Sequence, residues 1–366
     1  MGFGSPPNTG QHCPDFMSED SYLARTGQVE EIWRSLCEDI SPALLARLAE
    51  CVFVMLKPDA LATGKHQTML DRMASAGWRI LYAQAALTAS ARHFEELYKY
   101  NLTVRNEQNM LGDWWINARL YGMSPSLVLL LQVPPGIGRT AHQEVKSRKG
   151  PSNPFAGAPG QLRWEAGATN LALNLLHTAD DPISSAREFL IFGSTQDLGH
   201  ALARATAPDR APARRAIPPE VSTESLDEQI FLAGTGDRRL DLPSVLIGIK
   251  SRLRATETSD QFVEATDCLY ARYRDLARGG GDLHSRWRRF CDLSAEELAL
   301  VDSFHRSSAP AQSDPIMRHL ATPGEFRYET AGEIKIALLR RGIALDPWDD
   351  LALDTSMFYI SCFQPE

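Results

Sequence analysis

The sequence predicts a chain in which strands alternate with helices up to about residue 200, after which a mostly helical region follows. Continuous apolar runs of strand length occupy residues 51–56 and 127–133, and a third run over residues 171–176 carries Asn174 and ends at His177. Between these runs, and again after residue 230, apolar residues recur at helical spacing. We therefore expect a domain of mixed helices and strands, followed by a helical domain.

Composition divides the chain into four parts. Residues 1–49 comprise a disordered start rich in Gly, Pro and Ser, followed by a helical hairpin that is broken at Ser41-Pro42. Residues 50–200 form the mixed domain, and residues 201–225 are typical of a proline-rich linker. Residues 226–366 form a mostly helical domain whose role the sequence does not indicate.

The mixed domain carries polar residues where its elements end. The strand over residues 51–56 runs directly into Lys57, which places an ammonium group at the sheet edge, where a phosphate could bind. An amphipathic helix then stops at Gly77, residues 78–88 are strand-like, and two further helices carry Tyr98 and Trp114.

Residues 134–160 are rich in Pro, Gly and basic side chains, among them Lys146. A glycine-rich basic loop can bind an anion, although a solvated loop is the commoner explanation of such a composition. Further on, Ser185 and Glu188 have the spacing of a helix capping box. That spacing predicts a helix that starts near Ser185 and holds Glu188 in its first turn, close to the His177 imidazole. Taken alone, this stretch is more often a core histidine beside an ordinary helix start.

The helical domain shows several boundaries. Glycines 279–281 separate two helices, Ser294 resembles a helix start, a further helix covers residues 331–341, and residues 351–363 are expected to end in a strand. Arginines between residues 272 and 289 alternate with aspartates, which is typical of a solvated surface of mixed charge.

Composition excludes several classes of function. A net charge of −8 over 366 residues argues against a dedicated nucleic-acid binder. The six cysteines are scattered, with no Cys-x-x-Cys pair, so we expect reduced thiols and no zinc site. The first ten residues lack the pattern of a secretory signal, and no apolar run reaches membrane-spanning length. A cytoplasmic protein without a membrane partner is expected.

Several motifs, in their order along the chain, resemble the nucleoside diphosphate kinase family over residues 50–195. They are Lys57-Pro58-Asp59 after an apolar strand, Asn153-Pro154, Pro159-Gly160-Gln161-Leu162-Arg163, Asn174-Leu175-Leu176-His177, and Glu188. The resemblance implies an α+β fold, with a ferredoxin-like antiparallel sheet and helices on its faces.

The resemblance also implies an activity and a set of roles. Such enzymes move the γ-phosphate of ATP or another nucleoside triphosphate through a phosphohistidine to a nucleoside diphosphate, with Mg²⁺ held mainly by the nucleotide's own phosphates. His177 would be the nucleophile and Glu188 the carboxylate that orients its ring, while Lys57 and Tyr98 would lie near the transferred phosphate. The nucleotide-binding side chains would be Lys57, Trp114, Lys146, Ser152, Arg163 and Asn174.

These residue types suit phosphoryl transfer. An imidazole is partly unprotonated near neutral pH and can attack phosphorus, which divides the transfer into two steps. Cations placed around the phosphoryl oxygens supply most of the remaining catalysis, and Lys57, Lys146 and Arg163 would provide them.

The sequence departs from the family pattern beside the nucleophile and in the phosphate-binding set. Thr178-Ala179-Asp180 replaces the usual Gly-Ser-Asp, and Lys146 replaces an arginine, which gives up bidentate phosphate recognition. Two alternatives therefore stay open beside an active phosphotransferase: a catalytically weak nucleotide-binding or regulatory module, and a specialised pathway kinase for a nucleotide-like metabolite.

The extensions bear on assembly. Stand-alone members of the family form hexamers or tetramers through faces of this small domain. Extensions at both ends could cover those faces, so we expect a monomer or dimer. A protein partner, or self-association through the helical extension, is a further expectation.

Overall fold

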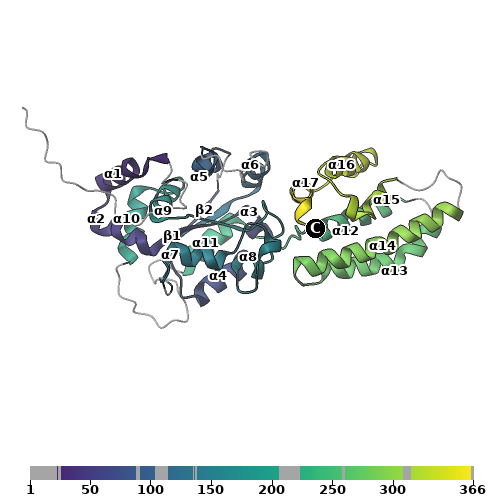
Figure 1. Ribbon diagram of the computed structural model, residues 1–366, viewed down its shortest axis with the longest axis horizontal. Helices are drawn as coiled ribbons and strands as arrows, with labels where there is room; N and C mark the ends of the chain where they lie inside the picture. Colours follow the sequence, from purple (N-terminus) through teal and green to yellow (C-terminus); the bar gives the residue numbers. More distant parts are fainter. Residues whose placement is uncertain are drawn as a thin grey trace, which may run out of the picture. The chain divides into compact units, whose positions relative to one another are not determined.

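The architecture comes from a computed structural model, which describes residues 23, 26–87, 91–103, 114–134, 136, 138–205, 223–257, 260–307 and 315–363. Contacts divide the chain into two compact units that interleave along the sequence (Figure 1). The sheet unit comprises Met1–Leu61, Gln67–Lys149 and Leu176–Thr235, and the helical unit comprises Ala62–His66, Gly150–Leu175 and Gly236–Glu366. The domain boundaries expected from the sequence stay a prediction.

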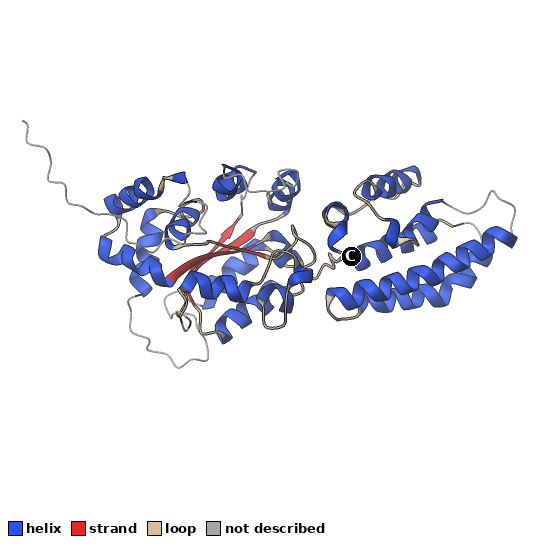
Figure 2. Ribbon diagram, viewed as in Figure 1, coloured by secondary structure: helices blue, strands red, loops and turns tan. Residues whose placement is uncertain are grey.

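The sheet unit contains a four-stranded antiparallel sheet in the order β2-β3-β1-β4 (Figure 2). The strands are β1 (Cys51–Leu56), β2 (Arg79–Ala86), β3 (Ser126–Gln132) and β4 (Leu176–Thr178). Together with the surrounding helices, this sheet confirms the predicted α+β class, followed by a mostly helical C-terminal region.

Strand β1 is the inner strand that pairs with both β3 and β4. All six of its residues are buried, because helices cover both of its faces. Phe53 and Met55 point to one face and join a core with Ile183, Ala186 and Phe189. Continuous apolar sequence is typical of a strand buried on two faces, which explains why this strand was predicted with the right bounds.

Helices surround the sheet. Those belonging wholly or mainly to the sheet unit are α1 (Val29–Asp39), α2 (Pro42–Leu45), α3 (Pro58–Ala62), α4 (His66–Ser75), α5 (Ala91–Thr103), α6 (Trp114–Met123), α7 (Ala141–Lys149), α9 (Pro182–Phe189), α10 (Thr195–Ala205) and α11 (Thr223–Ala233). The hairpin broken at Ser41-Pro42 is present as α1 and α2. The first 22 residues, and residues 206–222 of the expected linker, lie outside the described part of the chain.

The helical unit is built from α8 (Leu162–Glu165), α12 (Leu242–Arg254), α13 (Asp260–Arg278), α14 (Leu283–Ser307), α15 (Pro315–Leu320), α16 (Thr330–Arg340) and α17 (Pro347–Phe358). Helices α13 and α14 lie side by side along most of their length (Figure 1). The short segment Ala62–His66 belongs to this unit, and Gly236 lies against it. A Cβ at Gly236 would come within 2.6 Å of the Ala62 carbonyl oxygen, and the amide of Arg238 donates to that same oxygen at 3.1 Å.

The strand expected from Leu171 to His177 is right only at its end, because β4 comprises Leu176–Thr178 with His177 at its centre, and residues 171–175 lie outside it. The Oδ1 atom of Asn170 accepts hydrogen bonds from the amides of Ala172 at 2.9 Å and Leu173 at 2.8 Å. Such bonds from a side chain to the nearby backbone fold the chain into a turn and compete with strand pairing. An apolar run therefore forms a buried turn here.

Two expectations for the C-terminal region are also wrong. Ser294 does not start a helix but lies inside α14, where its hydroxyl is 3.1 Å from the hydroxyl of Tyr273 in a buried polar cluster with Lys250 and Glu297. Residues 351–363 contain the end of α17 and a short 3₁₀ turn over Ile360–Cys362, rather than a terminal strand.

Candidate active site

His177 lies at the centre of β4, opposite Met55 of β1, with its side chain 15% exposed. Its Nε2 atom is 2.8 Å from the Oε2 atom of Glu188, on α9. A carboxylate can only accept a hydrogen bond, so this contact places the ring proton on Nε2. The Nδ1 atom is then the ring nitrogen whose lone pair can attack a substrate.

Glu188 reaches the imidazole from the last turn of α9, and the capping box predicted at Ser185 is not formed. The helix is capped by Asp181, whose Oδ1 atom accepts from the Ser184 amide at 2.8 Å, and Pro182 follows as its first residue. Ser185 has a different role: its Oγ atom accepts from the amide of Phe53 in β1 at 3.1 Å. That bond ties α9 to the central strand.

Aromatic side chains surround the imidazole within the sheet unit. The Tyr98 ring meets the His177 ring edge to face, with centroids 5.2 Å apart, and its hydroxyl is 3.3 Å from that of Tyr121. Burial, followed by the influence of Tyr98, raises the pKa of Tyr121 well above its ordinary value, so this phenol stays neutral. The ammonium of Lys57, which is 2% exposed, lies 5.9 Å from the centre of the Tyr121 ring. Tyr121 thus links Lys57 to Tyr98 and His177.

The predicted basic loop is wrong for residues 141–149, which form helix α7, with Lys146, Arg148 and Lys149 in its last turn. The Nζ atom of Lys149 donates to the Oγ1 atom of Thr178, the residue after His177, at 2.8 Å. Burial raises the pKa of Asp180, and the charges of Lys149 and Lys146 act against that rise. Lys146 and Lys149 are therefore close enough to influence this region electrostatically.

The other predicted nucleotide-binding residues meet in the helical unit. Arg163 is 5% exposed, and its Nε and Nη2 atoms donate to the carbonyl oxygen and Oδ1 of Asn174 at 3.0 and 3.3 Å. Its Nη1 atom donates to the Gly150 carbonyl oxygen at 3.1 Å and to the Ser152 hydroxyl at 3.3 Å. One guanidinium therefore holds Ser152 and Asn174 together.

Leu175, between Asn174 and β4, has a φ of 74°, the one non-glycine residue of the described chain with a positive φ. A leucine in this left-handed region costs about 1–2 kcal/mol and persists only where its surroundings hold it. Arg163 fixes the residue before it, and the pairing of Leu176 with Leu56 fixes the residue after it. Backbone strain is thus stored two residues before His177.

Trp114 is the first residue of α6, and its side chain lies outside the described part of the structure; the neighbouring Trp115 is 43% exposed. Sequence reasoning missed Tyr121, Lys149 and Asn170 as members of the site. Lys149 was visible as part of a basic run. Tyr121 and Asn170 gave no local signal, because each acts through residues distant in the sequence.

Comparison with known proteins bears on this arrangement. Residues 50–198 match the family model described as nucleoside diphosphate kinase. These residues form a nucleoside diphosphate kinase-like domain. The family resemblance predicted from the sequence is thus confirmed for this part of the chain, and the match supports nucleotide phosphotransfer in general terms.

Two curated sequences and one solved structure are similar to part of this chain. The chain is 26% identical over 153 residues to a nucleoside diphosphate kinase of Methanocorpusculum labreanum, covering 41% of this chain and 91% of that protein. It is 28% identical over 149 residues to one of Desulfotalea psychrophila, covering 41% and 98%. A solved nucleoside diphosphate kinase of Aquifex aeolicus aligns over 40% of this chain and 97% of its own, with 21% identity and a TM-score of 0.34.

Across the described ranges, His, Cys, Asp and Glu side chains do not gather in groups of three or more that could hold a metal ion. Within the same ranges, each helix is too short or too polar to cross a membrane.

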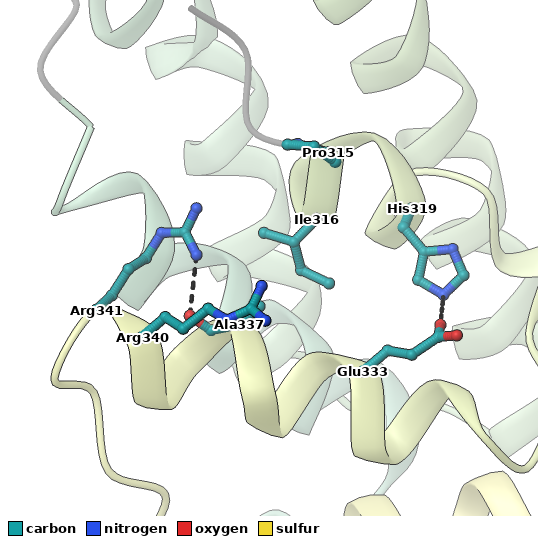
Figure 3. Close-up of a pocket in the computed structure, with 7 residues that line it drawn as sticks. All are labelled: Pro315, Ile316, His319, Glu333, Ala337, Arg340 and Arg341. Atoms are coloured by element: carbon teal, nitrogen blue, oxygen red, sulfur yellow. Dashed lines mark hydrogen bonds and ion pairs between the residues drawn. The ribbon is translucent and has the colours of Figure 1, made fainter.

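A separate cavity of about 600 Å³ lies in the helical unit, beside α15 and α16 (Figure 3). One wall carries His319, whose Nε2 atom is 3.2 Å from the Oε2 atom of Glu333. The cavity is lined by Pro315, Ile316, His319, Glu333, Ala337, Arg340 and Arg341. It includes none of the residues that the family resemblance implicates, so it adds nothing to the case for phosphotransfer.

A second histidine, on helix α7, contacts α9. His142, on α7, is 4% exposed, and its Nε2 atom is 2.8 Å from the Oγ atom of Ser185. Burial lowers the pKa of His142 from 6.5 to about 4, although the charge of Asp181 acts in the opposite direction. This histidine is therefore neutral in the folded protein near neutral pH.

The low pKa of His142 predicts a loss of stability in acid. Below about pH 6.5 the unfolded chain binds a proton at this residue that the folded chain does not, so the free energy of unfolding falls, by about 2.5 kcal/mol at about pH 4.5. Urea unfolding at about pH 7 and about pH 4.5 measures the fall, and His142→Gln should show a smaller one. Equal falls in both proteins would contradict the prediction.

Proposed function

We propose that this protein transfers the γ-phosphoryl group of a nucleoside triphosphate through His177 to a nucleoside diphosphate or a related acceptor. The observation that carries the proposal is the 2.8 Å hydrogen bond between His177 Nε2 and Glu188 Oε2. It fixes the tautomer and the ring orientation that a nucleophilic imidazole needs. The match of residues 50–198 to the nucleoside diphosphate kinase family supports the same reaction.

In the first half-reaction, the lone pair of His177 Nδ1 forms a bond to the γ-phosphorus. The bond from that phosphorus to the bridging oxygen breaks, and the nucleoside diphosphate leaves with the electron pair. The ring gains positive charge as the N–P bond forms, and the Glu188 carboxylate at Nε2 stabilises it. In the second half-reaction, a terminal phosphate oxygen of the acceptor attacks the phosphohistidine and releases the neutral ring.

The surrounding side chains have proposed roles in binding. Lys57 and Tyr98 both lie beside Tyr121, and the Tyr98 ring packs on the His177 ring. We therefore assign Lys57 and Tyr98 to the transferred phosphate. The remaining assignments follow the family resemblance: Lys146, Arg163 and Ser152 bind phosphate, Asn174 binds the ribose, and Trp114 stacks on the base. Mg²⁺ enters as part of the triphosphate substrate.

The departures from the family pattern beside His177 have visible replacements. Ala179 cannot support Glu188 through a hydroxyl, but the Nη2 atom of Arg187 lies 3.6 Å from Glu188 Oε1. Thr178 follows His177 on β4, so its side chain is buried on the opposite face of the strand, where it accepts from Lys149. These contacts support retained histidine chemistry.

The direct test is incubation with γ-labelled ATP and Mg²⁺, followed by measurement of acid-labile label on the chain. We expect label on the wild type and none on His177→Ala, because the nucleophile is removed. His200→Ala, a substitution of an exposed histidine on α10, is the matched control and should label normally. No label on a wild type that still binds ATP would indicate a nucleotide-binding module, and label on His177→Ala would place the nucleophile elsewhere.

The variant Glu188→Gln distinguishes a role of Glu188 in orienting the His177 ring from a role in binding ATP. An amide can donate to Nε2 and so favour the wrong tautomer, and it removes the charge that stabilises the phosphorylated ring. We expect the rate of labelling to fall roughly 100-fold, with little change in the dissociation constant for ATP. Glu144→Gln, at a buried carboxylate that pairs with Arg148 on α7, serves as the control. An unchanged rate in Glu188→Gln would remove the carboxylate from the mechanism.

A further inference from the structure

Asn170 connects the segment before the nucleophile to the C-terminal helix α17, within the helical unit. Its Nδ2 atom donates to Thr355 Oγ1 at 3.0 Å and to Ser356 Oγ at 3.2 Å. The exposed fraction is 1% for Asn170 and 0% for both hydroxyl residues. These two hydroxyls are 185 and 186 positions away in the sequence, so the contact is a product of the tertiary fold.

The Asn170 amide is fully satisfied, which fixes its orientation. Its oxygen accepts from the amides of Ala172 and Leu173, so its two N–H groups face α17. The Thr355 hydroxyl donates to the carbonyl oxygen of Leu351 at 2.9 Å in its own helix, which leaves a lone pair for Asn170. The two amide protons of Asn170 and the hydroxyl proton of Thr355 therefore all have acceptors.

The turn set by Asn170 leads directly into the nucleotide-binding residues. The Leu173 carbonyl oxygen accepts from the amide of Thr169 at 3.0 Å, and the Nδ2 atom of Asn174 donates to the Leu171 carbonyl oxygen at 2.6 Å. Asn174 then accepts from Arg163, and the strained Leu175 follows it. A change in the Asn170 turn would therefore move Asn174 and relax Leu175.

The same C-terminal region also holds the other end of the segment. Phe155, three residues after Ser152, packs edge to face on Phe363 and on His284, with ring centroids 4.6 Å apart in both pairs. Helix α17 and the residues after it thus support the segment near Ser152 and near Asn174.

We propose that Thr355 and Ser356 are positioning residues of the nucleotide site, and that the C-terminal helices set its affinity for nucleotide. This inference rests on the proposed function, because it assumes that Arg163 and Asn174 bind the nucleotide. Buried hydroxyl–amide pairs add little net stability but penalise every other arrangement of the same groups. The polar contact on α17 therefore specifies a geometry for the turn.

The test compares variants of the full chain in their binding of ADP with Mg²⁺, by titration calorimetry, and in their steady-state KM and kcat. In Thr355→Val/Ser356→Ala, the Asn170 amide loses both acceptors, and we expect the dissociation constant and KM to rise about tenfold, with a smaller change in kcat. The single variant Thr355→Ser keeps the hydroxyl at this position, so its affinity for ADP should stay close to that of the wild type. Thr266→Val removes a buried hydroxyl on α13 and controls for general destabilisation.

The outcomes separate the two proposals. If the double variant binds ADP as tightly as Thr266→Val does, the positioning role of α17 is wrong, whatever the labelling of His177 shows. If the wild type binds ADP but His177 takes no label, the phosphotransfer proposal fails while the affinities still decide the role of α17. A wild type that binds no nucleotide would overturn both.

Discussion

The geometry of the candidate active site depends on strand β1, which positions both His177 and Glu188. Antiparallel pairing places His177 opposite Met55, and the bond from the Phe53 amide to the Ser185 hydroxyl ties α9 to the same strand. Glu188, one turn further along α9, therefore arrives 2.8 Å from the imidazole. Because every residue of β1 is buried, this strand has little freedom to move. The distance between the His177 and Glu188 side chains is thus set by the pairing of the strand backbones and by the bond that ties α9 to β1.

The helical unit applies a similar constraint to the residues assigned to the nucleotide. Arg163 is almost completely buried, and its guanidinium holds Ser152 and Asn174. Asn170 sets the turn before them through α17. The strain at Leu175 persists because the residues on either side are held. Helices outside the nucleoside diphosphate kinase-like domain therefore contribute to the shape of a segment within it.

The sequence predicted those parts of the fold whose causes are local. Strand β1 was predicted because six consecutive apolar residues suit a strand covered on both faces. The first five residues of the strand expected from Leu171 to His177 do not form a strand, since Asn170 turns the chain with its own side chain. The capping box at Ser185 failed for a related reason: Asp181 offered a cap four residues earlier. The contact between Asn170 and Thr355 produces no periodic pattern in the sequence, so only the tertiary structure reveals it.

The departures from the family pattern beside His177 leave its contact with Glu188 in place. Thr178 follows His177 on β4, so its side chain points to the opposite face of the strand, where it is 4% exposed and its Oγ1 atom accepts from Lys149 at 2.8 Å. The proposed reaction needs the Nδ1 lone pair of His177 and the Glu188 contact, and neither involves residue 178. The replacement at position 178 therefore changes packing and charge behind the strand rather than at the imidazole.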